Sequence, residues 1–554
     1  MTVKVAVLVG YFLVVLGIGW VARTRWKSTP EAYFLANRQF GSLVLLGTMA
    51  ATNFSAFTVF GTSGAGYRDG YAFFPIMGFG TGFMALTFWI IGRGIRRAGH
   101  AHGLVTPPEL VKTLYQSPAL SLLFAVVMII FTIPYLALQP MAAGYALEEL
   151  VGLPYFGGCL LTTGIILLYT LRGGLRAVAW TDLFQGAFMF GLLALSTVMI
   201  ARHFGGFVQA NQDVLAIHPE LFSRPGGSGK YTLGIWFSFL LLWFFCDPMF
   251  PQLFQRFFAA RDDRAIGKTM LLYPLVCSVL FFFPISIGVM GHLAFPDLAG
   301  KGADKILPLV LTAISGDVMA ALVIAAGMAA LMSTMDSQLL TLSSMVTRDI
   351  MPLVGGTQAE TSGVGRLAVI GLSLAGLALA YKPPATILQI ATQTFTGLAV
   401  LFPTVIFGLY LRRVYAGAAI ASIVAGESLL VLFYLKLLPP GPFLAVVWVL
   451  LAAGGVYLTI HGVLSAREGR LRWRVPGWFQ DPYVWYFSGL FGLSLDYWAW
   501  EAVGPLFFGM PYWIGYFVLL SALQTGLMLG LLRRRGVRRL VVKIDSQVEP
   551  ESRV

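Results

Sequence analysis

About fifteen apolar stretches follow one another along the chain, and they constrain the fold more than any other feature. A helix of about 20 apolar residues crosses a bilayer, where it satisfies its own backbone hydrogen bonds. Hydrophobic residues make up 57% of the 554 residues and charged residues only 11%, which excludes a soluble globular protein. The sequence therefore predicts an all-α integral membrane protein. The predicted segments are 3–22, 42–66, 71–92, 119–147, 154–171, 177–201, 232–254, 269–295, 317–346, 367–381, 385–410, 415–435, 442–464, 482–501 and 509–532.

The lysine and arginine residues set the predicted orientation. Most of the 38 fall in loops on one side, opposite the N-terminus. Because cytoplasmic loops carry the basic excess, we expect the N-terminus outside and the C-terminus in the cytoplasm, in a multi-pass protein of the cell (inner) membrane. The same distribution accounts for the net charge of +13, so no nucleic-acid partner is expected. The segment 482–501 is predicted to cross, because otherwise the basic run at 533–539 would lie outside.

The segment 317–346 is an apolar helix that carries a carboxylate and several hydroxyls at mid-depth. At 3.6 residues per turn, one face combines small and hydroxyl side chains: Ala330, Ser333, Thr334 and Ser337. Asp336 lies at the edge of that face. Such oxygen-rich faces suit a hard cation, and an acid inside a membrane is a functional candidate. The alternative is that the hydroxyls hold neighbouring helices together.

Two segments contain signals that interrupt a helix. The second is rich in Gly, Ser and Thr around Asn53, and the seventh contains CDPMFPQ (246–252). The two prolines remove backbone donors and clash with the preceding turn, whereas close packing through small residues explains the second segment equally well. Five segments separate the two starts, which is the pattern of two five-helix inverted repeats. These repeats would cover about 42–201 and 232–410.

Further polar groups lie in other segments. Asp182 lies about two turns inside its segment, where an interhelical hydrogen bond is the alternative to a functional role. Gln389, Gln393 and Thr396 share one helical face that suits a polar cavity, and Glu427 is an isolated acid. The chain shows no nucleophile with a base and no metal constellation. It is therefore not expected to be an enzyme or to hold an organic cofactor.

Five stretches resemble members of the sodium:solute symporter family. They are EAYFLANRQFG (31–41), NFSAFTVFGTSGAGYRDG (53–70), GGLRAVAWTDLFQG (173–186), PQLFQRFFAAR (251–261) and AALMSTMDSQLLTLSSMVTRDI (329–350). The resemblance implies a LeuT-type fold with a 5+5 inverted-repeat core within 1–465. It also implies a sodium-coupled symporter, with Na⁺ as the coupling ion. Residues 466–554 would form an extension with about two further membrane segments and a basic cytoplasmic tail.

The resemblance also implies site residues. The common sodium site would comprise Ala51, Phe54, Ala330, Ser333 and Thr334, with carbonyl oxygens from the first three. A second cation site, which some members have, would comprise Asp182, Ser333, Asp336 and Ser337. Asp336 is an acid where those members carry a hydroxyl, so a second sodium, a proton or a structural bond stays open at this position.

The implied solute site lies beside the two breaks. Its residues would be Asn53, Thr58, Phe244, Asp247 and Gln393. The chain departs from sugar-carrying members at Thr58, Met77 and Asp247, which disfavours a sugar; a small monocarboxylate or an amino acid is the expected solute. The alternatives are a sensor or receptor with a transporter-like body and a proton-coupled symporter. The tail after Leu532 is too short for the soluble signalling domain that such sensors append.

Overall fold

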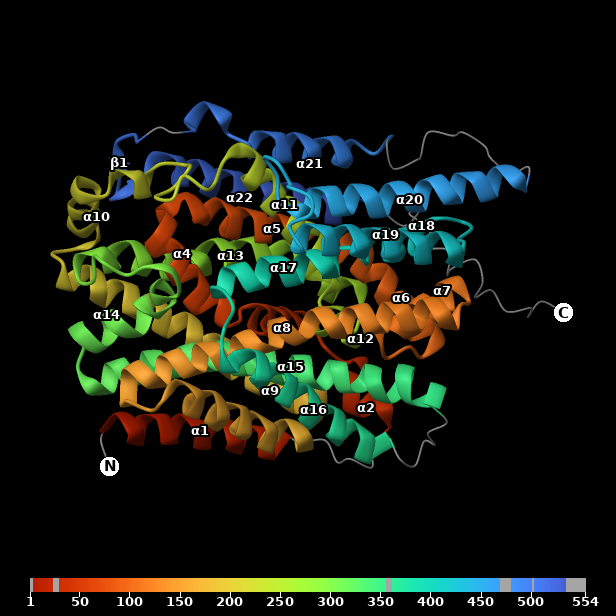
Figure 1. Cartoon of the computed structure of the whole chain (residues 1–554), viewed down its shortest axis with the longest axis horizontal. Coiled ribbons are helices and arrows are strands. Elements are labelled where there is room, and N and C mark those ends of the chain that lie inside the picture. The colour runs from red at the N-terminus through yellow and green to blue at the C-terminus, as the bar shows by residue number, and fades with distance from the viewer. Residues whose placement is uncertain (1–2, 23–28, 355–360, 469–479, 501–502, 535–554) are drawn as a thin grey trace.

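The computed structural model describes residues 3–22, 29–354, 361–468, 480–500 and 503–534. The long helices lie side by side along a common direction (Figure 1). Eleven helices of the described part are long and apolar enough to cross a membrane, and two further spans are bent pairs. The only strands in these ranges are the short antiparallel pair β1 (Leu506–Phe507) and β2 (Met510–Pro511). The predicted all-α membrane architecture is confirmed.

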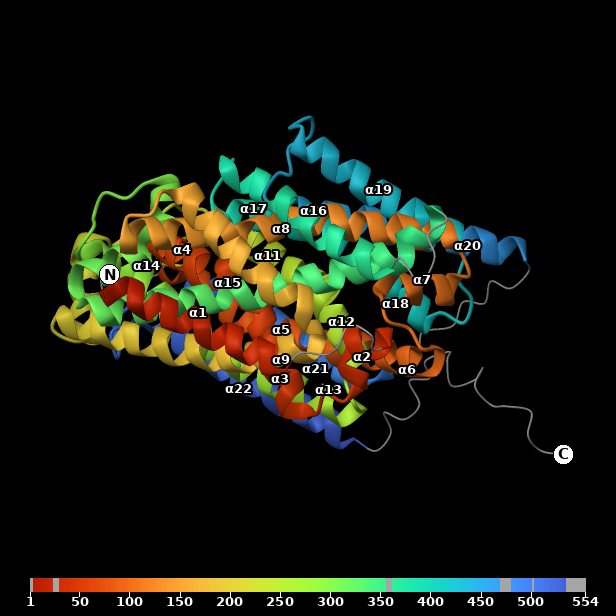
Figure 2. The same cartoon turned by 90° about the horizontal axis from the view of Figure 1, so that it is seen from below.

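The eleventh of these spans, Gly173–His203, is described below, and the other ten overlap the predicted segments. They are α1 (Val3–Ala22), Pro75–His102 ending in α6 (Arg93–His102), α8 (Pro118–Val151), α13 (Asp263–Met290), α15 (Asp317–Met345), α16 (Thr361–Tyr381), α17 (Ile387–Ala399) with α18 (Phe402–Tyr410), α19 (Ala416–Tyr434), α20 (Ala445–Arg467) and α22 (Tyr512–Arg533). Smaller helices in the loops include α2 (Pro30–Leu35), α7 (Pro107–Tyr115), α10 (Phe207–Ile217) and α14 (Ile306–Ile314). Helix α1 lies on the outer surface, across α9 and α15 (Figure 2).

The helix labelled α9 (Tyr155–His203) contains the two predicted segments 154–171 and 177–201. They are separated at Gly174, which has φ 66° and ψ 175°. A Cβ at this position would lie 2.9 Å from the Tyr33 carbonyl oxygen. Both the positive φ and the close approach favour glycine here, so Gly174 is where the chain passes from one span to the next.

Both predicted helix breaks are present. The first separates α3 (Ser42–Asn53) from a π-helical turn and α4 (Thr62–Asp69), with a bend of 61°. The Ala56 N–H at this break donates to Gln139 Oε1 of α8 at 3.1 Å, so a buried side chain satisfies the freed backbone. The second break separates α11 (Leu233–Cys246) and its terminal turn Asp247–Met249 from α12 (Pro251–Ala259), with a bend of 54°.

The predicted helix 482–501 is wrong in its extent. Helix α21 covers only Pro482–Leu493, and the chain continues through a short 3₁₀ turn, Tyr497–Ala499. Twelve residues of helix are about 18 Å long, which is shorter than the hydrocarbon core of about 30 Å. Three residues after the end of the helix, Asp496 adopts a positive φ of 29°.

The C-terminal extension packs on the core at one edge (Figure 1), where α22 lies along α13 and the Pro75–Met84 region. Ser278 and Ser521 hydroxyls meet at 3.1 Å across this contact. Helices α21 and α22 form a hairpin. At one end of this hairpin, Arg534 pairs with Asp481 at 2.6 Å. At the other end, the buried Arg224 guanidinium in the loop before α11 donates to the Asp496 carboxylate.

Aromatic rings enclose this second ion pair. The rings within 5.4 Å of the Arg224 guanidinium carbon belong to Trp236, Trp500, Trp513 and Phe517. The side chains of Asp496 and Arg224 are both fully buried. Burial thus disfavours both ions, so the pair fixes the position of the loop more than it adds net stability.

Candidate ion and solute sites

The oxygen-rich face of α15 meets the end of α3. Ser333 Oγ donates to the Ala51 carbonyl at 2.8 Å and lies 2.9 Å from the Ala330 carbonyl. Thr334 Oγ1 lies 3.0 Å from the Thr52 carbonyl and 3.2 Å from that of Ala330. All five residues are buried. Hydroxyl and carbonyl oxygens are the ligands of hard cations, so this cluster can exchange its internal hydrogen bonds for a bound ion.

Four of the five expected sodium-site residues therefore come together, and the Thr52 carbonyl joins them. Phe54 is the residue that caps α3, and its N–H donates to the Ala50 carbonyl at 2.9 Å. Carbonyls in the last turn of a helix have no intrahelical partner, which explains why Ala51 and Thr52 face α15. The sequence predicted where the helix breaks. Which backbone carbonyls contact α15, however, depends on the residue at which α3 ends.

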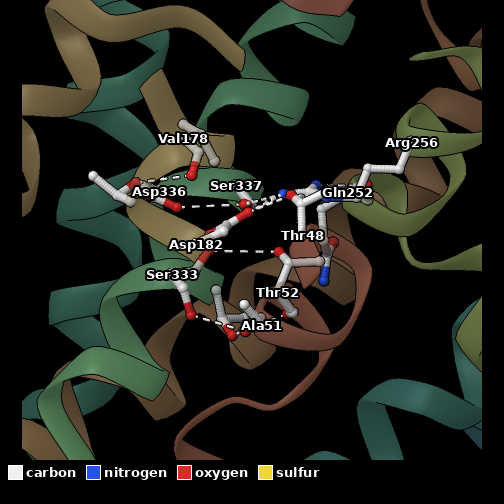
Figure 3. A network of polar contacts seen from close by, with 12 residues as sticks. Thr48, Ala51, Thr52, Val178, Asp182, Gln252, Arg256, Ser333, Asp336 and Ser337 are labelled. Atoms are coloured by element: carbon white, nitrogen blue, oxygen red, sulfur yellow. Dashed lines mark hydrogen bonds and ion pairs between the residues drawn. The ribbon is translucent and has the colours of Figure 1, made fainter. Parts of the chain in front are cut away.

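A second polar cluster lies next to this one, around Arg256 of α12 (Figure 3). Its Nη2 donates to Asp182 Oδ2 and to Ser337 Oγ, both at 2.8 Å. Its Nε donates to Thr48 Oγ1 at 2.9 Å, and its Nη1 donates to the Gln252 carbonyl at 2.9 Å. The Thr48 hydroxyl in turn contacts Asp182. A guanidinium thus joins α3, α9, α12 and α15.

This arrangement places an arginine beside the residues of the expected second cation site. The predicted segment 232–254 ended before Arg256, so the sequence missed the residue; its signal was a lone arginine among phenylalanines in QRFF. Asp182 is paired with that arginine, whereas Ser333 faces the first site. Asp336 accepts from Ser337 Oγ at 3.3 Å, and its Oδ2 has no hydrogen-bond partner among the described residues.

A small cavity lies between the two helix breaks. Its polar lining is Asn53, Thr58, Thr81 and Asp247. Its apolar lining is Phe57, Met77, Tyr135, Trp243, Phe250, Phe281 and Phe395. The cavity volume of about 20 Å³ accommodates about one water molecule, so an organic solute requires the surrounding helices to move apart.

Three of the five expected solute-site residues line this cavity: Asn53, Thr58 and Asp247. The other two lie elsewhere. Phe244 packs against Phe83, with ring centroids 5.7 Å apart, and Gln393 is exposed. Successive residues of a helix are rotated by about 100°. An error of one or two positions in the expected residue therefore places its side chain off the face that lines the cavity. Trp243 and Phe395 line the cavity in their place.

A larger hollow of about 510 Å³ is lined by segments at the end of the protein where the N-terminus lies (Figure 1). It is lined by the end of α4, the loops around Glu220 and Leu298, and the start of α17 at Leu388. Arg68 in its wall pairs with the buried Asp304 at 3.0 Å. Burial raises the pKa of Asp304 although Arg68 opposes the shift.

Comparison with known proteins decides the family. The family model described as "Sodium:solute symporter family" matches residues 33–426. The chain belongs to this family. A relative named Sodium/pantothenate symporter, from Escherichia coli (strain K12), is 29% identical over 436 residues, covering 76% of this chain and 88% of the relative. The High-affinity proline transporter PutP of Bacillus subtilis (strain 168) is 26% identical over 427 residues, covering 75% and 89%.

Solved structures show the same fold for this family member. A Na⁺-coupled sialic acid symporter, in a substrate-bound outward-open state, matches with a TM-score of 0.71 and 19% identity, covering 84% of this chain and 98% of that chain. The nucleobase-cation-symport-1 family transporter MHP1, in a closed conformation, matches with a TM-score of 0.57 and 14% identity, covering 79% and 96%. The LeuT-type fold is thus confirmed, and the family is one of transporters, not enzymes.

Proposed function

We propose that this family member is a sodium-coupled symporter that imports a small organic solute, a monocarboxylate or an amino acid, by alternating access. The observation that carries the proposal is the cluster of five oxygens between the end of α3 and α15. A cation there would hold two separate elements together. Asn53 follows Thr52 directly and lines the neighbouring cavity, so ion binding and solute binding share one turn of backbone.

The two hollows fit alternating access. The central cavity has a volume of only about 20 Å³, whereas the larger hollow, at the end of the protein where the N-terminus lies, has a volume of about 510 Å³. The solute would enter through that hollow and bind when the helices beside the two breaks separate. The orientation proposed above, with the N-terminus outside and the C-terminus in the cytoplasm of the cell (inner) membrane, makes this direction import. Residues 466–554 are proposed to stand outside the transport core.

A second coupling ion is also proposed, at Asp182 and Asp336. With both carboxylates ionised, the buried cluster has one negative charge more than Arg256 neutralises. Burying an uncompensated charge is costly, so one further positive charge is expected there. Because Asp336 Oδ2 has no described partner, that charge can be a proton, which makes a proton-coupled symporter the second candidate function.

Uptake into vesicles that contain the purified protein tests the proposal. Labelled amino acids, carboxylates and sugars are supplied under a sodium gradient, a proton gradient, both or neither. Sodium-driven accumulation of a small organic solute is the expected result. Accumulation driven by protons alone would favour the second candidate, and accumulation of nothing under any gradient would favour the sensor alternative.

A further inference from the structure

We propose that the transported solute carries a positively charged amine, which binds the Asp247 carboxylate inside a cage of aromatic rings. The inference rests on the proposed function, and it selects an amino acid or another ammonium compound over a carboxylate that lacks an amine. The charge of the central cavity and the kinds of side chain around it carry the argument.

Asp247 supplies the charge of the cavity. Its side chain is only 2% exposed, and it accepts hydrogen bonds from Asn53 Nδ2 at 3.2 Å and from Cys246 Sγ at 3.3 Å. No lysine, arginine or histidine stands among the residues that line the cavity. An acid inside a membrane is costly without a partner, and a cationic ligand would supply the missing charge.

Asn53 holds this carboxylate at the junction of the two breaks. Its Nδ2 donates to Asp247 Oδ2 and also to the Tyr273 hydroxyl, at 2.8 Å. The amide therefore bridges α3, the turn after α11 and α13. The carboxylate of Asp247 is fixed by neutral donors, whereas Asp182 in the neighbouring cluster is paired with Arg256.

The aromatic lining suits the same ligand. Phe395 is the centre of the cage: its ring centroid lies 4.7 Å from that of Phe250, 4.8 Å from that of Tyr135 and 5.5 Å from that of Trp243. Ring faces attract ammonium groups, and desolvated cages of several rings recognise them. A carboxylate without an amine would meet Asp247 and the ring faces, all of which repel it.

Two unpaired donors in the lining fit a zwitterion. Thr81 Oγ1 and Trp243 Nε1 are buried and have no hydrogen-bond partner among the described residues, and both residues line the cavity. Trp243 Cδ1 would lie 3.7 Å from a Cβ added at Gly80, the residue that precedes Thr81. A solute carboxylate there would satisfy donors that otherwise stay unpaired.

Ligand binding to the full-length purified protein tests the inference. The panel pairs amino acids with the acids that lack the amine, for example 2-aminobutyrate with butyrate, and adds propylamine and choline. Ligand-induced thermal stabilisation and tryptophan fluorescence are measured in sodium chloride. We expect the tightest ligand to carry an amine and to bind at least about tenfold more tightly than its partner without one, a factor typical of one charged contact.

Substitution at Asp247 provides the second readout. Asp247→Asn should weaken binding of the amine ligand at least about tenfold, while Asp213→Asn, the same change on α10 outside the cavity, should leave it unchanged. The inference is overturned if the tightest ligand carries no ammonium group, if no ammonium compound of the panel binds, or if Asp247→Asn binds that ligand as tightly as the wild type. Sodium-driven uptake of an acid without an amine would overturn the inference and leave the proposed function standing.

Discussion

At the scale of single residues, the position of each polar side chain along its helix decides its role. Ser333 and Thr334 are neighbours in sequence, yet each hydroxyl reaches a different carbonyl at the end of α3. The preceding helical turn supplies the Ala330 carbonyl to both. The two hydroxyls and the three carbonyls that they contact therefore form one cluster of oxygen atoms.

Removal of these hydroxyls should weaken sodium activation. In the double variant Ser333→Ala and Thr334→Ala, the ion loses two oxygen ligands in a site of low dielectric. We expect the sodium concentration for half-maximal uptake to rise at least about tenfold, which corresponds to about 1.4 kcal/mol. The control is Ser343→Ala, which removes a hydroxyl of the same helix that contacts only the Leu340 carbonyl. Wild-type sodium dependence in the double variant would reject the site.

Asp336 allows a separate test of the second coupling ion. Asp336→Asn keeps the shape of the side chain and removes the excess negative charge beside Asp182 and Arg256. We expect a lower sodium Hill coefficient or a flatter pH profile of uptake, with solute affinity at saturating sodium nearly unchanged. Both quantities are measured on reconstituted protein. If neither changes, Asp336 has a structural role and the first site alone couples the ion.

At the scale of helices, the sequence predicted the interruptions better than the faces. Two prolines force the break after α11, and the hydroxyl-rich helix was predicted as 317–346 and ends at Met345. Both follow from local chemistry. In contrast, the sequence predicted that Phe244 lines the cavity, whereas Trp243 does so. The prediction failed because α11 is apolar around both residues, so no polar residue marks the face toward the cavity. The ion pair between Asp182 and Arg256 joins residues 74 positions apart, and no local pattern predicts it.

The backbone at the break between α3 and α4 should depend on Gln139. This side chain is buried and accepts the Ala56 N–H. Gln139→Leu would leave that donor unpaired, which typically costs about 1–3 kcal/mol. We expect a lower thermal unfolding temperature in purified protein and weaker sodium activation. Gln139→Glu retains an acceptor and should lose less sodium activation; equal losses in both variants would show that the hydrogen bond is not the cause.

At the scale of the whole molecule, the family core and the extension meet through few polar contacts. The family model ends at residue 426. Helix α22 follows later in the sequence and packs against α13 of the core. The ion pairs at the two ends of the hairpin connect it to the loop before α11 and to itself. The sequence predicted two further membrane segments there but not their attachment, since Arg224 and Asp496 are distant in sequence.

The pair between Arg224 and Asp496 should show strong coupling. Asp496→Leu alone leaves a buried arginine without its carboxylate, and removal of one partner of such a pair costs about 3–5 kcal/mol. Replacement of both, with Arg224→Met and Asp496→Leu, should cost much less, because an apolar pair needs no compensation. Thermal unfolding of the single and double variants measures the coupling. Additive losses would show that the two side chains act independently.

The tail after Leu532 provides the test of topology. Asp481 pairs with Arg534 at one end of the hairpin, and Asp496 pairs with Arg224 at the other. The basic residues after Leu532 predict a cytoplasmic tail. A cysteine or fluorescent reporter fused after Val554 should therefore be inaccessible to reagents added outside intact cells. The same reporter placed before Thr2 should be accessible. Labelling of the tail from outside would show that this arm of the hairpin does not cross.

The attachment of Arg224 also sets an order of events during biosynthesis. Its carboxylate partner is 272 residues further along the chain. At a synthesis rate of about 5–20 residues per second, the loop before α11 waits roughly 15 to 55 s for that partner to be made. During this interval the guanidinium must stay hydrated at the membrane surface, so the pocket of tryptophans can close around it only after the last hairpin has been inserted.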